Sequence, residues 1–230
     1  MTTDTYYSNV NPHLLKLIPK KANRLLELGC GGGSLGAAYK EHVNPEAHYQ
    51  GVELVAAAAQ VALRKLDRVI VGNVEVLSNE DLDIEEASLD CLIYGDVLEH
   101  LIDPWKELAK RKKLLKNKGH VLACIPNLQH WSVIYKIIAD QWAYEDSGIL
   151  DRTHLRFFTR SGIQDLFTSA GLKVMRMIGI PESVESGTPF VRGLFPVLEP
   201  MGIDAQKFET QAGNYQYLVK AIRVMDRETA

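Results

Sequence analysis

The sequence predicts an α/β fold built on a doubly wound, mostly parallel β-sheet. Short apolar runs with strand character alternate with helix-like segments over most of the 230 residues, which is typical of this class. The run at 24–28 stops on glycines, as a buried parallel strand does where it turns into a helix. The length suits one large α/β domain, and we expect residues 1–230 to form a single domain.

Each further element follows from a local pattern. Leucines at 14, 15 and 17 after Asn11-Pro12 predict a short amphipathic helix that Pro19 ends, and Gly171 is a good cap for the helix before it. The last two strands have no clear helix between them and are joined by a stretch with four prolines, which predicts an antiparallel pair at one sheet edge. The expected strands are 24–28, 48–53, 68–71, 89–94, 120–125, 173–180 and 215–224, and the expected longer helices are 34–43, 56–66, 104–115 and 160–170.

Two segments, about 127–158 and 181–214, are longer than a connection requires. Long loops in a compact domain are usually functional or disordered, and the aromatic content of these two favours order. We expect both insertions to form a lid or cap over a substrate.

Composition and charge exclude several classes of protein. The net charge is −3, and we interpret the densest basic run, 110–113, as the solvated face of a helix, so no nucleic-acid partner is expected. The three cysteines at 30, 91 and 124 match no metal-site spacing, so we expect small core residues in a reducing compartment and no metal. Without an apolar leader or a stretch long enough to span a membrane, we expect a cytoplasmic monomer or homodimer.

The glycine-rich loop Gly29-Cys30-Gly31-Gly32-Gly33 lies between a strand and a helix. Glycines let the backbone approach a ligand closely, and a helix N-terminus offers unpaired N–H groups, so the loop fits a nucleotide-like cofactor. Residues 31–36 also satisfy the G-x-G-x-x-G dinucleotide pattern, which leaves NAD open at this point. No lysine follows the glycines and Glu27 precedes them, which suits a cationic nucleoside better than a polyphosphate.

Acidic and amide side chains at the next strand ends complete the predicted cofactor site. Glu53 ends the second strand, where its carboxylate can accept hydrogen bonds from ribose hydroxyls. Asn73, just past the third strand, could hydrogen-bond an adenine edge while Val74 packs on the ring. An exposed strand-end glutamate and an ordinary turn asparagine are the alternatives.

Two segments carry a family resemblance. Residues 25–31 (LLELGCG) resemble the first motif of class I S-adenosylmethionine-dependent methyltransferases, and 90–100 (DCLIYGDVLEH) resemble that family's fourth-strand motif. The resemblance covers about residues 22–224 and implies a Rossmann-like methyltransferase fold, with a seven-stranded sheet whose last strand is antiparallel. It implies S-adenosyl-L-methionine as cofactor and a lid contribution from Tyr6-Tyr7. The cofactor contacts expected are Glu27, Gly29, Cys30, Gly31, Glu53, Leu54, Asn73, Val74, Asp96 and Val97.

Polar residues beyond the fifth strand are the candidates for the methyl acceptor site. A hydroxyl acceptor must lose its proton, so a positioned base is expected, whereas carbon or amine acceptors need less. Segment 148–159 (GILDRTHLRFFT) resembles a stretch of bacterial methyltransferases linked to sugars and surface glycans. We take His154, Asp151 and His100 as catalytic candidates. His130, Trp131, Tyr135, Arg152 and Arg156 are candidate acceptor contacts.

Structural roles compete with these assignments. Asp151, Arg152, His154 and Arg156 could tie a lid down as a salt-bridged clamp, and Trp131, Tyr135 and Trp142 have roughly helical spacing that suits simple packing. The function expected is methyl transfer to a hydroxyl of a small molecule or sugar intermediate. The alternatives are an N- or C-methyltransferase, an NAD-dependent oxidoreductase and a catalytically inactive cofactor-binding module.

Overall fold

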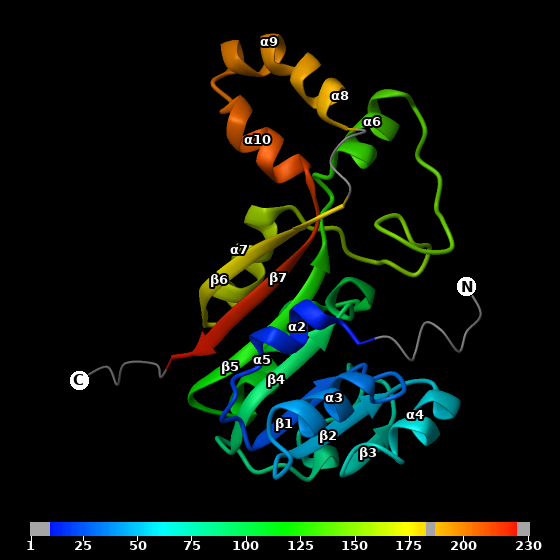
Figure 1. Cartoon of the computed structure of the whole chain (residues 1–230), viewed down its shortest axis with the longest axis vertical. Helices are drawn as coiled ribbons and strands as arrows, with labels where there is room; N and C mark the ends of the chain where they lie inside the picture. The colour runs from blue at the N-terminus through cyan, green and yellow to red at the C-terminus, as the bar shows by residue number, and fades with distance from the viewer. Residues whose placement is uncertain (1–9, 183–186, 225–230) are drawn as a thin grey trace.

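A seven-stranded sheet forms the centre of the protein, with the strand order β3-β2-β1-β4-β5-β7-β6 (Figure 1). The computed structural model describes residues 10–182 and 187–224. From β3 to β5 neighbouring strands pair in parallel, whereas β7 pairs antiparallel with both β5 and β6. The predicted mostly parallel sheet with an antiparallel last strand is therefore confirmed. The strands are β1 Arg24–Leu28, β2 His48–Glu53, β3 Arg68–Val71, β4 Leu89–Gly95, β5 Leu115–Pro126, β6 Leu172–Pro181 and β7 Asn214–Arg223.

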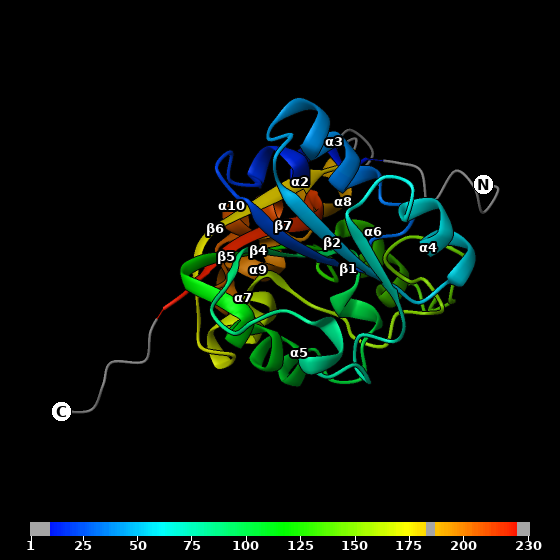
Figure 2. The same ribbon diagram turned by 90° about the horizontal axis from the view of Figure 1, so that it is seen from below.

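Helices cover both faces of this sheet. In Figure 2, α2 and α3 lie on one face and α5 and α7 on the other. Because side chains alternate along a strand, Leu25 packs with Leu14 of α2 and Tyr39 of α3, while its neighbour Leu26 packs with Leu108 of α5 and Phe167 of α7. The helices of these layers are α2 Pro12–Leu17, α3 Ser34–His42, α4 Ala56–Ala62, α5 Pro104–Arg111 and α7 Arg160–Ser169.

The remaining helices gather at one end of the molecule, at the top of Figure 1 beyond the last residue of β5. Helix α6 (Trp131–Ile138) lies in the first insertion, and α8 (Thr188–Gly193), α9 (Phe195–Leu198) and α10 (Ala205–Ala212) lie in the second. Val191 and Phe208 of the second insertion form a small apolar cluster with Trp131 of the first. The two insertions are thus packed against one another.

The expectation of no clear helix between the last two strands was wrong. Pro189, Pro196 and Pro200 each stand in the first turn of a helical segment, in α8, α9 and the 3₁₀ turn Glu199–Met201. The first turn is the place where proline is tolerated, because its missing N–H would have no partner there. The prolines therefore begin helices in this stretch, although in the sequence they resemble signs of a loop.

The basic run 110–113 is only in part the solvated face that the sequence suggested, since Lys113 is exposed but Arg111 is not. Arg111 is fully buried and donates to the backbone oxygens of Val74, Leu77 and Ser78 and to Glu107. The Nζ of Lys110 donates to the Val74 oxygen as well. A guanidinium group has five N–H donors and can bind several carbonyl oxygens of one segment at once. Helix α5 therefore holds in place the chain that follows β3.

Among the described residues, no helix combines the length and the apolar character that crossing a membrane requires.

Candidate functional site

The glycine loop joins β1 to α3 through backbone conformations that favour glycine. Gly29, Gly31 and Gly33 have φ values of 73°, 52° and 73°. A Cβ on Gly29 would lie 2.5 Å from Cγ2 of Val97, so the loop passes too close to the chain after β4 for any side chain. The N–H groups of Gly29 and Cys30 both donate to the Val52 oxygen, which fixes the loop against β2.

Glu53 links the end of β2 to the glycine loop. Its Oε2 accepts from the Gly31 N–H at 2.8 Å, and its Oε1 accepts from the Val55 N–H at 2.8 Å. The side chain is buried, and each carboxylate oxygen keeps a second lone pair for a further donor. A ligand hydroxyl at this strand end would therefore meet an acceptor that is already oriented.

Glu27 is a second buried carboxylate, on β1 just before the loop. The Tyr49 hydroxyl donates to its Oε2 at 2.9 Å. Burial raises the pKa of Glu27 to about 8, an effect that the Tyr49 hydrogen bond opposes and the nearby charge of Glu53 reinforces. A positively charged ligand beside Glu27 would favour its ionised form.

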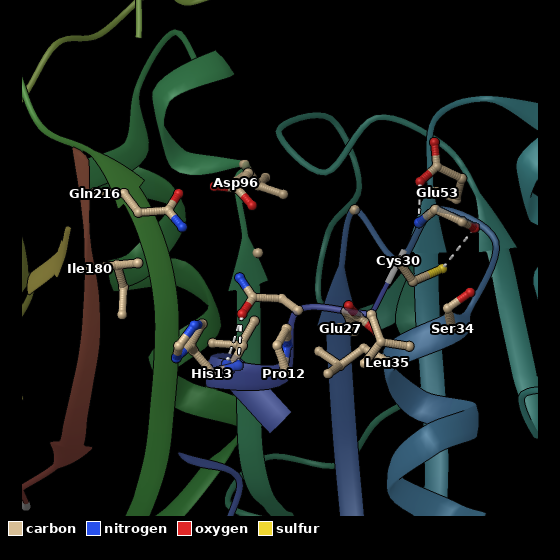
Figure 3. A pocket seen from close by; sticks show the side chains of 17 residues that line it. Pro12, His13, Glu27, Cys30, Ser34, Leu35, Glu53, Asp96, Ile180 and Gln216 are labelled. Atoms are coloured by element: carbon tan, nitrogen blue, oxygen red, sulfur yellow. Dashed lines mark hydrogen bonds between the residues drawn. The ribbon is translucent and has the colours of Figure 1, made fainter. Parts of the chain in front are cut away.

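These groups line a cavity of about 610 Å³ (Figure 3). Glu53 and Cys30 lie at one end of the cavity, while Ile180 and Gln216 lie at the other. Among the described residues that line it there are three carboxylates and neither a lysine nor an arginine. The lining thus fits a cationic amino-acid-bearing nucleoside and does not suit a polyphosphate. The lining residues are Val10, Asn11, Pro12, His13, Leu14, Glu27, Gly29, Cys30, Gly31, Ser34, Leu35, Glu53, Gly95, Asp96, Val97, Ile180 and Gln216.

Several lining positions were not predicted from the sequence. Asn11 caps α2 by accepting from the His13 and Leu14 N–H groups, which places the start of this helix at the cavity. Ile180 and Gln216 are paired across β6 and β7. An Asn-Pro pair opening a helix was visible in the sequence, but the pairing of two late strands beside β5 was not specific enough to place these side chains at the cavity.

Asp96 and Val97 follow β4 and line the same cavity. Asp96 has a φ of 55°, in the left-handed region, and its N–H donates to the Cys124 oxygen at 3.3 Å. Burial raises the pKa of its carboxyl group, opposed by a hydrogen bond with Cys124 and by His154. Rare backbone conformations of this kind tend to cluster at functional sites, and this one lies in the wall of the cavity.

Leu54, Asn73 and Val74 lie outside the cavity lining. Leu54 is 65% exposed, whereas Val74 is buried in the main core. The Asn73 Oδ1 accepts from the Glu75 N–H, so its side chain forms a local turn. Their contact with the cofactor stays a prediction, and the Tyr6-Tyr7 lid falls outside the described residues.

A polar cluster of Glu99, His100 and His154 lies beyond the end of β4. One carboxylate oxygen and one ring nitrogen from each histidine lie within 4.8 Å of one another. Nδ1 of His154 lies 3.0 Å from the Ile149 oxygen, and the two imidazole rings meet edge to face at 4.7 Å. The fold therefore brings together His100 and His154, two of the three catalytic candidates, and adds Glu99.

The environment of the cluster shifts two of its groups. Burial raises the pKa of Glu99 well above its ordinary value, and the neighbouring Asp96 carboxylate raises it further. Burial also lowers the pKa of His100, with His154 acting in the same direction. Both shifts favour neutral side chains, as expected where charges have left water.

The expected salt-bridged clamp takes another form. Asp151 accepts from the Thr153 N–H at 2.8 Å and from its hydroxyl at 2.6 Å, while Arg152 pairs with Asp146. Arg156 donates to the Ile102 and Leu155 oxygens. The segment is held to the chain after β4 by backbone bonds from the Leu155 and Arg156 N–H groups to the Glu99 oxygen, and by side-chain contacts of Arg156 with Ile102 and of His100 with Thr153.

His130, Trp131 and Tyr135 begin and line α6. The His130 ring is fully buried between Trp131 and Tyr215, with Nδ1 2.8 Å from the Ser132 hydroxyl. Burial lowers the pKa of His130 to about 4. Tyr135 is half exposed and packs edge to face on Phe190, and Trp142 lies beyond the helix, which ends at Ile138. Trp131 and Tyr135 therefore pack against neighbouring side chains from one helix, as the packing interpretation expects. Trp142 is not part of that helix.

Known proteins resemble this chain over most of its length. A family model described as a methyltransferase domain matches residues 5–176. The chain is 29% identical over 177 residues to a ubiquinone biosynthesis O-methyltransferase from Paraburkholderia phymatum, covering 74% of this chain and 75% of that protein. It is 26% identical over 143 residues to an uncharacterized 37.1 kDa protein of a Streptomyces fradiae transposon, covering 62% of this chain but only 41% of that protein.

A solved structure has the same fold at lower sequence identity. The structure of a SAM-dependent methyltransferase from Archaeoglobus fulgidus superposes with a TM-score of 0.64 at 18% identity, covering 96% of this chain and 95% of that one. The sheet order, the glycine loop and the antiparallel last strand are therefore features of a fold with solved examples.

Proposed function

Since the chain belongs to the methyltransferase-domain family, we propose that it methylates a hydroxyl group on a small molecule, with a sugar or glycan intermediate favoured. Family membership makes the protein an S-adenosylmethionine-dependent methyltransferase, so the open question is the acceptor. When bound, S-adenosylmethionine supplies a methyl group that is attached to a positively charged sulfur. Transfer of the methyl group leaves this sulfur as a neutral sulfide.

The cofactor would be held by the residues of the cavity. The Glu53 carboxylate would accept from ribose hydroxyls, and Glu27 would face the cationic end of the cofactor. Asn73 would hydrogen-bond the adenine, at the position that the family resemblance implies, and Val74 would pack on its ring. Leu54 would be a further cofactor contact. Glu53 and Glu27 are already oriented by hydrogen bonds, which lowers the entropic cost of binding.

The hydroxyl acceptor is supported by one observation, the histidine of the first insertion. A carbonyl oxygen can only accept, so the 3.0 Å contact with Ile149 assigns the ring proton of neutral His154 to Nδ1. Nε2 then carries a free lone pair, which can assist removal of the acceptor's proton as the O–C bond forms and the S–C bond breaks. An amine or carbon acceptor would depend less on a base that removes a proton. The name of the Paraburkholderia relative, an O-methyltransferase, points the same way.

The first test identifies the acceptor atom. Purified protein with isotope-labelled cofactor is offered phenols, sugars and their amine analogues, and the product is analysed by mass spectrometry. We expect the labelled methyl group to be attached to an oxygen of the product. A labelled methyl group found only on nitrogen or carbon would contradict the hydroxyl acceptor.

The second test concerns His154. His154→Ala should lower turnover about 100-fold, the lower end for a positioned proton-transfer group, while cofactor affinity barely changes. His42→Ala serves as the matched control, because His42 lies exposed on α3. Unchanged turnover in His154→Ala would remove this residue from the proposed role.

A further inference from the structure

Glu99 is a buried carboxylate, which is stable only when a hydrogen-bond donor or a cation interacts with it. Its side chain is 1% exposed, and neither carboxylate oxygen has a hydrogen-bond partner in another described residue. A buried polar group without a partner is costly and rare, and binding an ion or a ligand is one way in which a protein satisfies it. The backbone around it is held firmly, since the Glu99 carbonyl accepts from both Leu155 and Arg156.

Two imidazoles face this carboxylate with their donors already used. Nδ1 of His100 lies 3.2 Å from the Thr153 carbonyl oxygen and 3.1 Å from the Thr153 hydroxyl, whose own proton is donated to Asp151. Nδ1 of His154 lies 3.0 Å from the Ile149 carbonyl oxygen. Each carbonyl assigns the proton of a neutral ring to Nδ1 and leaves the Nε2 lone pair free. Histidines that ligate metals almost always donate their other ring N–H to a carbonyl or carboxylate, because this fixes the tautomer and the ring orientation.

We propose that Glu99, His100 and His154 form a binding site for a divalent cation of the zinc type. Two imidazole nitrogens and one carboxylate oxygen are a ligand set that such borderline cations favour, and three protein ligands leave a position open. One carboxylate oxygen of Glu99 and one ring nitrogen from each histidine lie within 4.8 Å of one another. Ligand atoms on a tetrahedral zinc are about 3.3 Å apart, given bonds of ~2.0–2.1 Å, so side-chain rotations that close the set by at most about 1.5 Å complete the site.

The sequence predicts no metal, because its cysteines and short spacings match no metal site. His100 and His154 are 54 positions apart and meet only because the first insertion folds back on the chain after β4. Glu99 and His100 are neighbours in the chain, but no local pattern places His154 beside them. The site is therefore visible only in three dimensions.

This inference rests on the proposed function and adds a role for the cation in it. The open position would bind the acceptor hydroxyl, which ionises more readily on a divalent cation than in water. The Nε2 lone pair of His154 would then bind the cation, so His154 would assist loss of the proton through the cation, and the proton itself would pass to water. Asp96 lines the cofactor cavity and interacts electrostatically with Glu99 and His154, so the two sites are adjacent.

The test is a titration of metal-free, full-length protein with Co²⁺, followed by visible absorption and by displacement with Zn²⁺. We expect one ion per chain, with the absorption bands of a low-coordinate cobalt site that Zn²⁺ abolishes. Glu99→Gln and His100→Asn should each weaken binding by about 10- to 100-fold or more, since even outer-shell changes have effects of this size. His42→Asn is the matched control, and circular dichroism checks that each variant is folded.

Several outcomes would overturn the inference. Absence of the cobalt bands, or equal affinity in Glu99→Gln, His100→Asn and His42→Asn, would show that these residues do not bind the cation. Methyl transfer to a hydroxyl that survives a strong chelator, together with absent cobalt bands, would reject the cation and leave the proposed function intact. Clear cobalt binding with label only on nitrogen or carbon would instead reject the hydroxyl acceptor and retain the metal site.

Discussion

Two buried carboxylates flank the glycine loop and differ in what holds them. Glu53 accepts from two backbone N–H groups, at 2.8 Å each, whereas Glu27 accepts from the Tyr49 hydroxyl at 2.9 Å. Backbone donors stabilise a carboxylate in its charged form, while burial beside a second carboxylate favours the neutral form. Glu53 is therefore suited to orient neutral hydroxyls, and Glu27 to respond to a charged ligand.

The raised pKa of Glu27 predicts that cofactor affinity depends on pH. The folded, ligand-free protein keeps Glu27 protonated below pH about 8, and a cationic ligand favours the ionised form. Binding below this pH must release the proton, which costs about 1.4 kcal/mol per pH unit. Affinity for S-adenosylmethionine, whose sulfonium makes it cationic, should rise as the pH approaches 8 and then level off when measured by calorimetry. Glu27→Gln should flatten the profile, and an identical profile in both proteins would contradict this assignment.

The lowered pKa of His130 predicts a loss of stability in acid. Burial brings this pKa from 6.5 to about 4, so between these values the unfolded chain binds the proton more readily than the folded protein. Stability is therefore complete above pH 6.5 and falls as the pH falls towards 4, by about 1.4 kcal/mol per pH unit from this group.

Urea unfolding of wild type and of His130→Phe at several pH values between 4 and 7 measures this effect. The variant should lose less stability on acidification than wild type, because it lacks the group that takes up the proton. His42→Phe, at an exposed position, should behave as wild type does. Equal slopes in wild type and His130→Phe would show that His130 does not titrate in this way.

At the scale of elements, the turn from β1 into α3 depends on backbone conformation. Gly33 precedes α3 with a φ of 73°, and a Cβ there would lie 3.0 Å from the Ala62 Cα. Gly33→Ala should lower the free energy of unfolding by about 1–3 kcal/mol, from strain in the left-handed region. Gly193→Ala is the matched control, because a Cβ at that position meets nothing within 4 Å. The prediction fails if both variants unfold at the same urea concentration.

Helices and strands were well predicted where the local sequence pattern determines their bounds. Strands at 24–28, 48–53 and 68–71 agree with β1, β2 and β3 residue for residue, because apolar runs between turn residues mark them clearly. The helix expected over 104–115 ends as an α-helix at Arg111 and continues as a 3₁₀ turn, where Leu115 already begins β5. Prolines that start helices in 188–201 resemble loop signals, since sequence alone does not say on which side of a proline a helix lies.

At the scale of the whole molecule, the cavity beside the glycine loop and the cluster of Glu99, His100 and His154 are adjacent at the carboxyl end of the sheet. That Glu27, Gly29, Gly31 and Glu53 lie together at one cavity follows from the sequence, because the ends of parallel strands bring these positions together. Asn11 and Gln216 were not anticipated, since they reach the cavity through the packing of α2 and the pairing of β7. The cluster around Glu99 forms because the first insertion folds back on the chain after β4. No periodic pattern in the sequence predicts this path.

The binding of adenosylhomocysteine to the full-length protein, measured by calorimetry with NAD as the competing ligand, tests the assignment of the cofactor most directly. We expect one site for adenosylhomocysteine and none for NAD at millimolar concentration. Glu53→Gln should weaken the binding by about tenfold or more, as expected for lost hydrogen bonds to a charged group. Failure to bind adenosylhomocysteine at millimolar concentration, or tighter binding of NAD, would contradict this assignment of the cofactor.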